Sequence, residues 1–165
     1  MDITAIFNSF ELNFLSDAVA VVDSRIEALE ARTKLSPDSD GEGLFDQIEY
    51  LTGFGLVACQ AYLTSSLSAA EVNKRVGLEV GPRHACGHSI ASLVNALANY
   101  WKHSSEWELP MLSRTQKTAD LVSSLGADLD APYVIINAFT ELVRPGPPRV
   151  ARVIPFLAQW QHELP

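Results

Sequence analysis

Cysteine is scarce in this chain of 165 residues, which contains only Cys59 and Cys86. Two cysteines supply no second pair for a disulfide framework or a zinc knuckle. Such sparing use is typical of a reducing compartment, and we predict a cytoplasmic location. The first residues, MDITAIFNSFELNF, have no basic segment ahead of an apolar run, so they do not resemble a secretory signal.

Positive charge is also scarce in the first part of the chain. Residues 1–70 contain eleven acidic and three basic side chains, a balance of −8, whereas residues 71–165 contain nine of each. Because phosphate binding is mainly electrostatic, this acidic part argues against broad wrapping by nucleic acid. It is compatible with a small phosphate site in the neutral part. We interpret the acidic part as a solvated face.

One long run, residues 51–70, contains no charged side chain. This run reaches the length of a membrane span, but it includes Gln60, two threonines, three serines and two glycines. Its apolar content is therefore below that of a typical transmembrane helix. We predict a helix buried in the core and no membrane association.

Strand-like alternation is lacking, and apolar residues instead recur every three or four positions, as in helices. We expect helices at 3–34, 44–69, 82–104 and 113–126, one following a cap at Asp130, and a last one that Pro155 splits. The apolar positions of the first are Ile3, Phe7, Phe10, Phe14, Ala18, Val21, Val22, Ile26 and Leu29. Gly53 and Gly55 weaken the second helix or allow another helix to approach. The sequence predicts an all-α, up-down bundle of five or six helices in one domain, residues 1–165.

Three of the four histidines lie in the stretch EVGPRHACGHSIASLVNALANYWKHSSEW, residues 79–107. On a helix from Pro82 to Ser104, the residues within roughly 40° of Asn95 are His84, His88, Asn99, Lys102 and Glu106. His103 lies just outside this polar stripe. Histidine and asparagine are mediocre helix formers, so the stripe is explained if it faces a groove or a partner helix. The alternative is a solvated surface.

Two kinds of chemistry follow from the residue types alone. His84 and His88, four positions apart, can both reach one metal ion, but a third ligand is missing. Cys86 points to the opposite face, which disfavours a cysteine nucleophile paired with a histidine. We therefore expect no cofactor and no metal site. Metal binding by His84 and His88 stays an alternative to this expectation.

In the stretch RHACGH, four residues separate Arg83 from His88. An arginine, four to six residues and a histidine on a helical bundle resembles the signature of the HEPN superfamily. The resemblance implies an all-α, commonly dimeric protein that cleaves RNA without metal or binds nucleotides, often in toxin or defence systems. It implies that His88 transfers protons and that Arg83 stabilises the charge developing on the phosphate. Asn95, Asn99, Lys102 and His103 would line the groove.

The sequence thus leads to two hypotheses. The first is a HEPN-like ribonuclease or nucleotide-binding protein, working as a homodimer, with Arg83 and His88 as catalytic residues. In it, His84, Asn95, Asn99, Lys102, His103 and Glu106 contact substrate or partner. The second is a non-enzymatic interaction module that uses the same stripe as a dimer or partner interface.

Overall fold

The protein folds into a bundle of helices in the computed structural model, which describes residues 3–106 and 113–165. The α-helices are α1 (Ile3–Thr33), α2 (Leu44–Ala69), α3 (Lys74–Gly77), α4 (Ile90–His103), α5 (Ser113–Ser123), α6 (Val134–Leu142) and α7 (Ile154–His162). The 3-10 helices are η1 (Ser104–Glu106) and η2 (Val150–Val153). Within the described residues there is no strand, only an isolated bridge between Arg83 and Ser89. The all-α prediction is confirmed, and the four-residue α3 is the helix that the sequence analysis did not predict.

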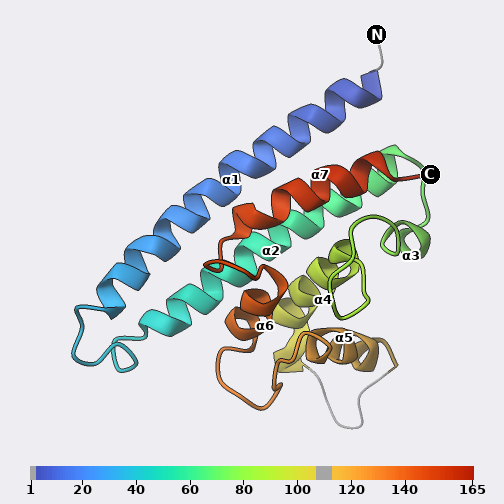
Figure 1. Ribbon diagram of the computed structural model, residues 1–165. Coiled ribbons are helices and arrows are strands. Elements are labelled where there is room, and N and C mark those ends of the chain that lie inside the picture. Colours follow the sequence, from blue (N-terminus) through green and yellow to red (C-terminus); the bar gives the residue numbers. More distant parts are fainter. Residues whose placement is uncertain (1–2, 107–112) are drawn as a thin grey trace.

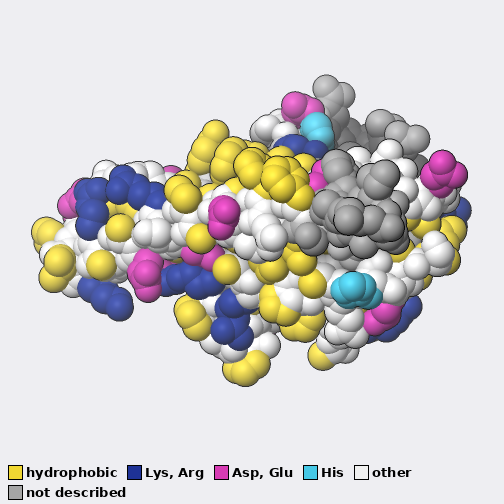
Figure 2. Space-filling view, turned by 90° about the horizontal axis from the view of Figure 1, so that it is seen from above, with side chains coloured by type: hydrophobic (Ala, Val, Ile, Leu, Met, Phe, Trp, Pro, Cys, Tyr) yellow, Lys and Arg dark blue, Asp and Glu magenta, His cyan; other side chains and the backbone are white. Residues whose placement is uncertain are grey.

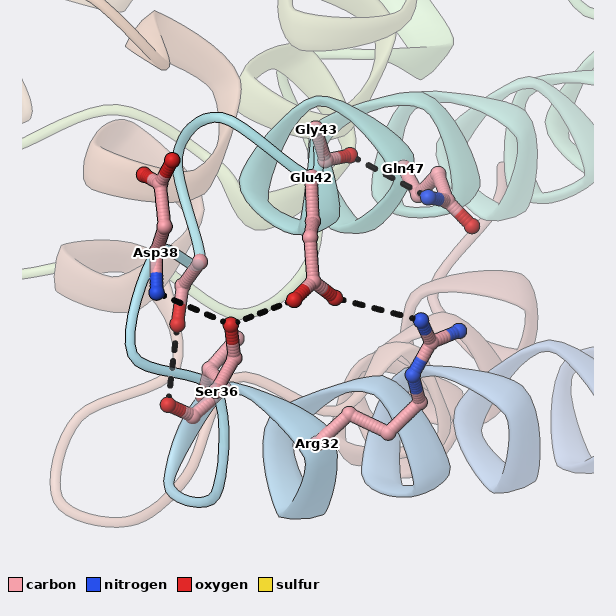
Figure 3. Close-up of polar contacts among 8 residues, drawn as sticks. Arg32, Ser36, Asp38, Glu42, Gly43 and Gln47 are labelled. Atoms are coloured by element: carbon pink, nitrogen blue, oxygen red, sulfur yellow. Dashed lines mark hydrogen bonds and ion pairs between the residues drawn. The ribbon is translucent and has the colours of Figure 1, made fainter.

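The two long helices α1 and α2 run side by side in opposite directions and form one layer of the bundle (Figure 1). Helix α7 lies along them, α4 and α6 pack against α2, and α5 packs against α4 (Figure 1). The loop between α1 and α2 is held by polar contacts, in which Glu42 accepts hydrogen bonds from Ser36 and Arg32 (Figure 3). No described helix is long and apolar enough to cross a membrane.

The two glycines of α2 allow close packing, which is one of the two roles that the sequence suggested for them. A Cβ atom added at Gly53 would lie 2.1 Å from Cδ1 of Trp101 in α4. One added at Gly55 would lie 2.7 Å from Cγ2 of Val150. Because both distances are far shorter than van der Waals contact, only glycine lets α2 approach its neighbours this closely. Helix α2 begins and ends at the predicted residues.

The apolar positions given for the first helix are only partly buried. Phe10 and Phe14 are each 67% exposed and Val21 is 73% exposed. The buried residues of α1 are Leu15, Val19, Val22, Asp23, Ile26 and Leu29. Hydrophobic side chains gather on the surface seen from the side of α1 (Figure 2). The core face is therefore rotated from the predicted one, and Ile3 and Phe7 have side chains outside the described set.

Carboxylates of the long helices cap the shorter ones. Oδ1 and Oδ2 of Asp23 accept hydrogen bonds from the backbone N–H groups of Val150 and Ala151, at 2.7 and 2.8 Å. Glu49 likewise accepts from two N–H groups in the first turn of α6. The predicted cap Asp130 does not cap α6, which begins after Tyr133 in the left-handed region, at φ 58°. The predicted split at Pro155 is confirmed, because Pro155 lies in the first turn of α7, after η2.

Candidate functional site

A cleft with a volume of about 810 Å³ lies between α3, α4 and α5. Polar and charged residues make up most of its lining, and the elements around it lie in the right half of Figure 1. Its lining residues are Asn73, Lys74, Arg75, Leu78, Glu79, Ser92, Asn95, Ala96, Asn99, Lys117, Thr118 and Leu121. A cleft of this size accommodates a small organic ligand.

The floor of the cleft is the polar side of α4, and it is built on a buried glutamine. Gln60 of α2 is only 6% exposed. Its Nε2 atom donates hydrogen bonds to Oδ1 of Asn95 at 2.9 Å and to Oδ1 of Asn99 at 2.8 Å. Its Oε1 atom accepts a hydrogen bond from Nζ of Lys102 at 2.6 Å. Part of the predicted stripe therefore faces a partner helix, as the sequence analysis expected of an asparagine-rich face.

The rim of the cleft carries positive charge. Lys74 and Arg75 come from α3 and Lys117 from α5, and all three are exposed. None of these cations forms an ion pair with a described residue. Partial desolvation, and next the nearby charge of Lys102, lower the pKa of the Lys74 ammonium. Unpaired cations around a polar cleft, in a chain with a net charge of −8, favour an anionic ligand.

One acidic residue, Glu79, lies at the end of the cleft near the start of α4. The hydroxyl of Ser92 lies between Glu79 and the backbone, with Oγ 2.9 Å from the carbonyl oxygen of Leu78 and 3.4 Å from Oε1 of Glu79. The hydroxyl of Ser89 also donates to the carbonyl of Leu78. These contacts use the Ser92 hydroxyl within the protein, so Asn95 and Asn99 are the floor groups left for a ligand.

The helix predicted to begin at Pro82 begins at Ile90, and residues 82–89 form a loop. Ser89 caps α4, because its Oγ accepts a hydrogen bond from the backbone N–H of Ser92 at 3.1 Å. Gly87, at φ +93°, adopts the left-handed region, which is foreign to a right-handed helix. His84 and His88 therefore do not lie on the helical stripe.

The loop is closed by its own polar groups. The guanidinium of Arg83 donates to the carbonyl oxygens of Gly87, at 2.7 Å, and Glu79, at 3.2 Å. Nδ1 of His84 accepts a hydrogen bond from the backbone N–H of Cys86 at 3.2 Å, and the backbone N–H of His84 donates to the carbonyl of His88. Arg83 thereby joins the loop of His88 to the end of the cleft at Glu79.

The remaining stripe residues lie at the far end of α4. His103 and Glu106 are exposed and face each other, with 3.3 Å between Nδ1 and Oε2. The structure thus brings Asn95, Asn99 and Lys102 together around Gln60, and places His103 and Glu106 in a separate surface pair. Trp107, the last residue of the histidine-rich stretch, lies outside the described residues.

Metal ligands and reactive thiols are not assembled near the cleft. Among the described residues, no three His, Cys, Asp or Glu side chains gather so as to hold a metal ion. Cys59 is fully buried, and burial raises the pKa of its thiol to about 12, which keeps it protonated. The Cys86 sulfur contacts the hydroxyl of Ser124 at 3.8 Å.

Sequence reasoning missed the residues that complete the site: Gln60, Lys74, Arg75 and Lys117. Gln60 had a signal, because it is the one amide in the uncharged run 51–70. The three cations had none, since they come from two separate segments that only the fold brings together. No family model, curated protein sequence or solved structure matches the chain.

Proposed function

We propose that this protein binds a small phosphate-bearing ligand of the nucleotide class in the cleft between α3, α4 and α5. The observation that carries the proposal is a set of three cations around a floor of two asparagines. These cations, Lys74, Arg75 and Lys117, form no ion pair with a described residue. The cations supply the charge complementarity, and the asparagine floor supplies hydrogen-bonding groups. In a chain with a net charge of −8, this local concentration of positive charge is a distinct feature.

Replacing a rim cation is expected to weaken binding. We expect Lys117→Gln and Lys74→Gln each to raise the dissociation constant of ADP about tenfold, the equivalent of one charge-assisted hydrogen bond. Isothermal titration calorimetry at low and high salt measures this, and added salt should weaken binding by the wild type. Lys34→Gln is the matched control, because Lys34 is exposed but does not line the cleft. Equal losses in all three variants would contradict a local site.

Metal-independent RNA cleavage is a second proposed function, and one observation favours it. The loop 82–89 holds the Arg83 guanidinium 2.7 Å from the carbonyl of Gly87, the residue before His88. Arginine has five N–H donors, so donors remain for a phosphate after the two contacts of Arg83 with the backbone. The loop lies beside Glu79, so an RNA phosphate at His88 would be next to the proposed nucleotide cleft.

Replacing His88 tests the cleavage proposal. We expect wild-type protein to cut a mixed RNA pool in EDTA, and His88→Ala to lose at least 100-fold in rate, the usual contribution of a general acid or base. His162→Ala is the matched control, because His162 is exposed at the end of α7. Equal cutting by wild type and His88→Ala would refute the role of His88. HEPN membership and the homodimer also remain proposals, and sedimentation equilibrium tests the latter.

A further inference from the structure

The buried side chain of Gln60 determines how two asparagines of the cleft floor are oriented. A single nitrogen, Nε2, donates to Oδ1 of Asn95 and to Oδ1 of Asn99. Both of its hydrogens are thereby directed to side-chain oxygens, although Nε2 also lies 3.3 Å from the backbone carbonyl of Asn95. Each asparagine must therefore turn its carbonyl oxygen toward α2.

Lys102 fixes the orientation of Gln60 itself. A lysine ammonium has only donors, so the group facing it must be an acceptor. Nζ of Lys102 lies 2.6 Å from Oε1 of Gln60, which directs the Gln60 nitrogen away from Lys102 and toward the asparagines. A flipped Gln60 would place its NH₂ against the ammonium and its oxygen against two carbonyl oxygens. The charge of Lys102 thus sets the orientation of three amides in sequence.

The orientation of Gln60 determines which amide groups of Asn95 and Asn99 face the cleft. The NH₂ group of an amide points away from its carbonyl oxygen, so each Nδ2 is directed away from Gln60. Both asparagines line the cleft, and neither Nδ2 has a hydrogen-bond partner among the described residues. Glu11 Oε2 is the one buried side-chain polar atom left unpaired in the described part of the chain, so neither Nδ2 is buried without a partner. The floor therefore presents two adjacent donors.

We propose that Gln60 and Lys102 are positioning residues that make the cleft floor a pair of hydrogen-bond donors, selecting ligands that present acceptor oxygens to it. This inference rests on the proposed function, because it concerns the same cleft. The acceptor is a phosphate oxygen or a carbonyl oxygen of a base. Neither oxygen carries a proton, so both accept hydrogen bonds. A ligand that presents an amino group to the floor is disfavoured, because donor would meet donor.

Gln60→Glu is expected to reverse the floor while keeping its shape. The glutamate pairs with Lys102 and has only acceptors, so both asparagines turn their NH₂ groups toward it. Their carbonyl oxygens then face the cleft and repel an acceptor. We expect at least a tenfold loss of affinity, measured by calorimetry with pyrophosphate, UMP and uridine. Loss for pyrophosphate places a phosphate on the floor, and loss confined to UMP and uridine places a base carbonyl there.

Two controls separate orientation from charge and from damage to the fold. Uridine carries no charge, so weaker uridine binding cannot come from added negative charge. Gln60→Met is neutral and leaves the asparagines free to rotate, so its loss of affinity should be smaller than that of Gln60→Glu. Circular dichroism and the midpoint of urea unfolding show whether each variant keeps the helical bundle.

A second readout does not depend on ligand binding. Solvent exchange of the Asn95 and Asn99 side-chain NH₂ protons, followed by NMR, should be fast in the wild type and slowed in Gln60→Glu. If wild type binds none of the probes but exchange slows in the variant, the proposed function fails and the orientation by Gln60 stands. Unchanged exchange in Gln60→Glu, or wild-type affinity for every probe that binds, would overturn the inference.

Discussion

Trp160→Ala is expected to lower the free energy of unfolding by about 4 kcal/mol, the usual cost of removing a large buried aromatic side chain. Trp160 is 1% exposed and is the largest of the fully buried side chains. Its ring packs edge-on against Tyr62 of α2, with 6.5 Å between centroids. Its Nε1 atom donates a hydrogen bond to the carbonyl oxygen of Gly77, at 2.8 Å, at the end of α3. Because Trp160 thereby fastens α7 to both α2 and α3, its loss also loosens one wall of the cleft.

Urea unfolding measures the effect, and two variants divide it into parts. Trp160→Phe keeps an aromatic ring but leaves the Gly77 carbonyl without its donor, so we expect roughly half of the loss. Phe156→Ala is the matched control, because Phe156 lies on the same helix but is 38% exposed. A Trp160→Ala loss no larger than that of Phe156→Ala would show that α7 is not anchored through Trp160.

The parts of the fold that were predictable depend on local patterns. The bounds of α2 follow from a helical run between two loops, and Gly53 and Gly55 gave a direct signal of close packing. The asparagine-rich face of α4 also indicated a buried partner, and Gln60 is that partner. In these cases the residues that determine the feature lie on the element concerned.

The features that were predicted wrongly share a physical origin. Each of them depends on a distant residue or on one backbone angle. The start of α6 depends on Glu49, which lies 86 positions before Ile135. The loop 82–89 depends on the left-handed Gly87 and on the cap at Ser89, which override the helical start suggested by Pro82. The side of α1 that is buried depends on where α2 packs, and Phe10 and Phe14 fit the helical period but stay largely exposed.

The acidic part of the chain shows most clearly how a charge count can mislead. It suggested a solvated face, but several of its acids bind other elements. Asp23 and Glu49 cap η2 and α6, and the carboxylate of Glu30 pairs with the guanidinium of Arg149. These three carboxylates connect the long hairpin of α1 and α2 to the later helices. Acidic residues that hold segments together should make the free energy of unfolding depend on pH, whereas exposed acidic residues should not.

Asp23→Ala is expected to lower the free energy of unfolding by about 3 kcal/mol at pH 7. The substitution leaves the backbone N–H groups of Val150 and Ala151 without an acceptor, and hydrogen bonds to charged groups contribute about 1.5–3 kcal/mol each. The gain from no longer burying a carboxylate offsets part of this, since Asp23 is 8% exposed. Asp17→Ala, at an exposed position of α1, is the matched control and should cost little.

The pH dependence of the same variant tests the cause. Burial raises the pKa of Asp23 above its ordinary value of 3.8, although the N–H groups of Ala151 and Val150 act in the opposite direction. A group whose pKa is higher in the folded than in the unfolded state stabilises the fold at low pH. This stabilisation is complete below the unfolded-state pKa and is lost as the pH rises through the folded-state pKa. The Asp23→Ala variant lacks this stabilisation. The difference between its free energy of unfolding and that of the wild type should therefore grow as the pH falls from 7 toward 4. Urea unfolding across this range measures it, and a constant deficit would mean that Asp23 titrates alike in both states.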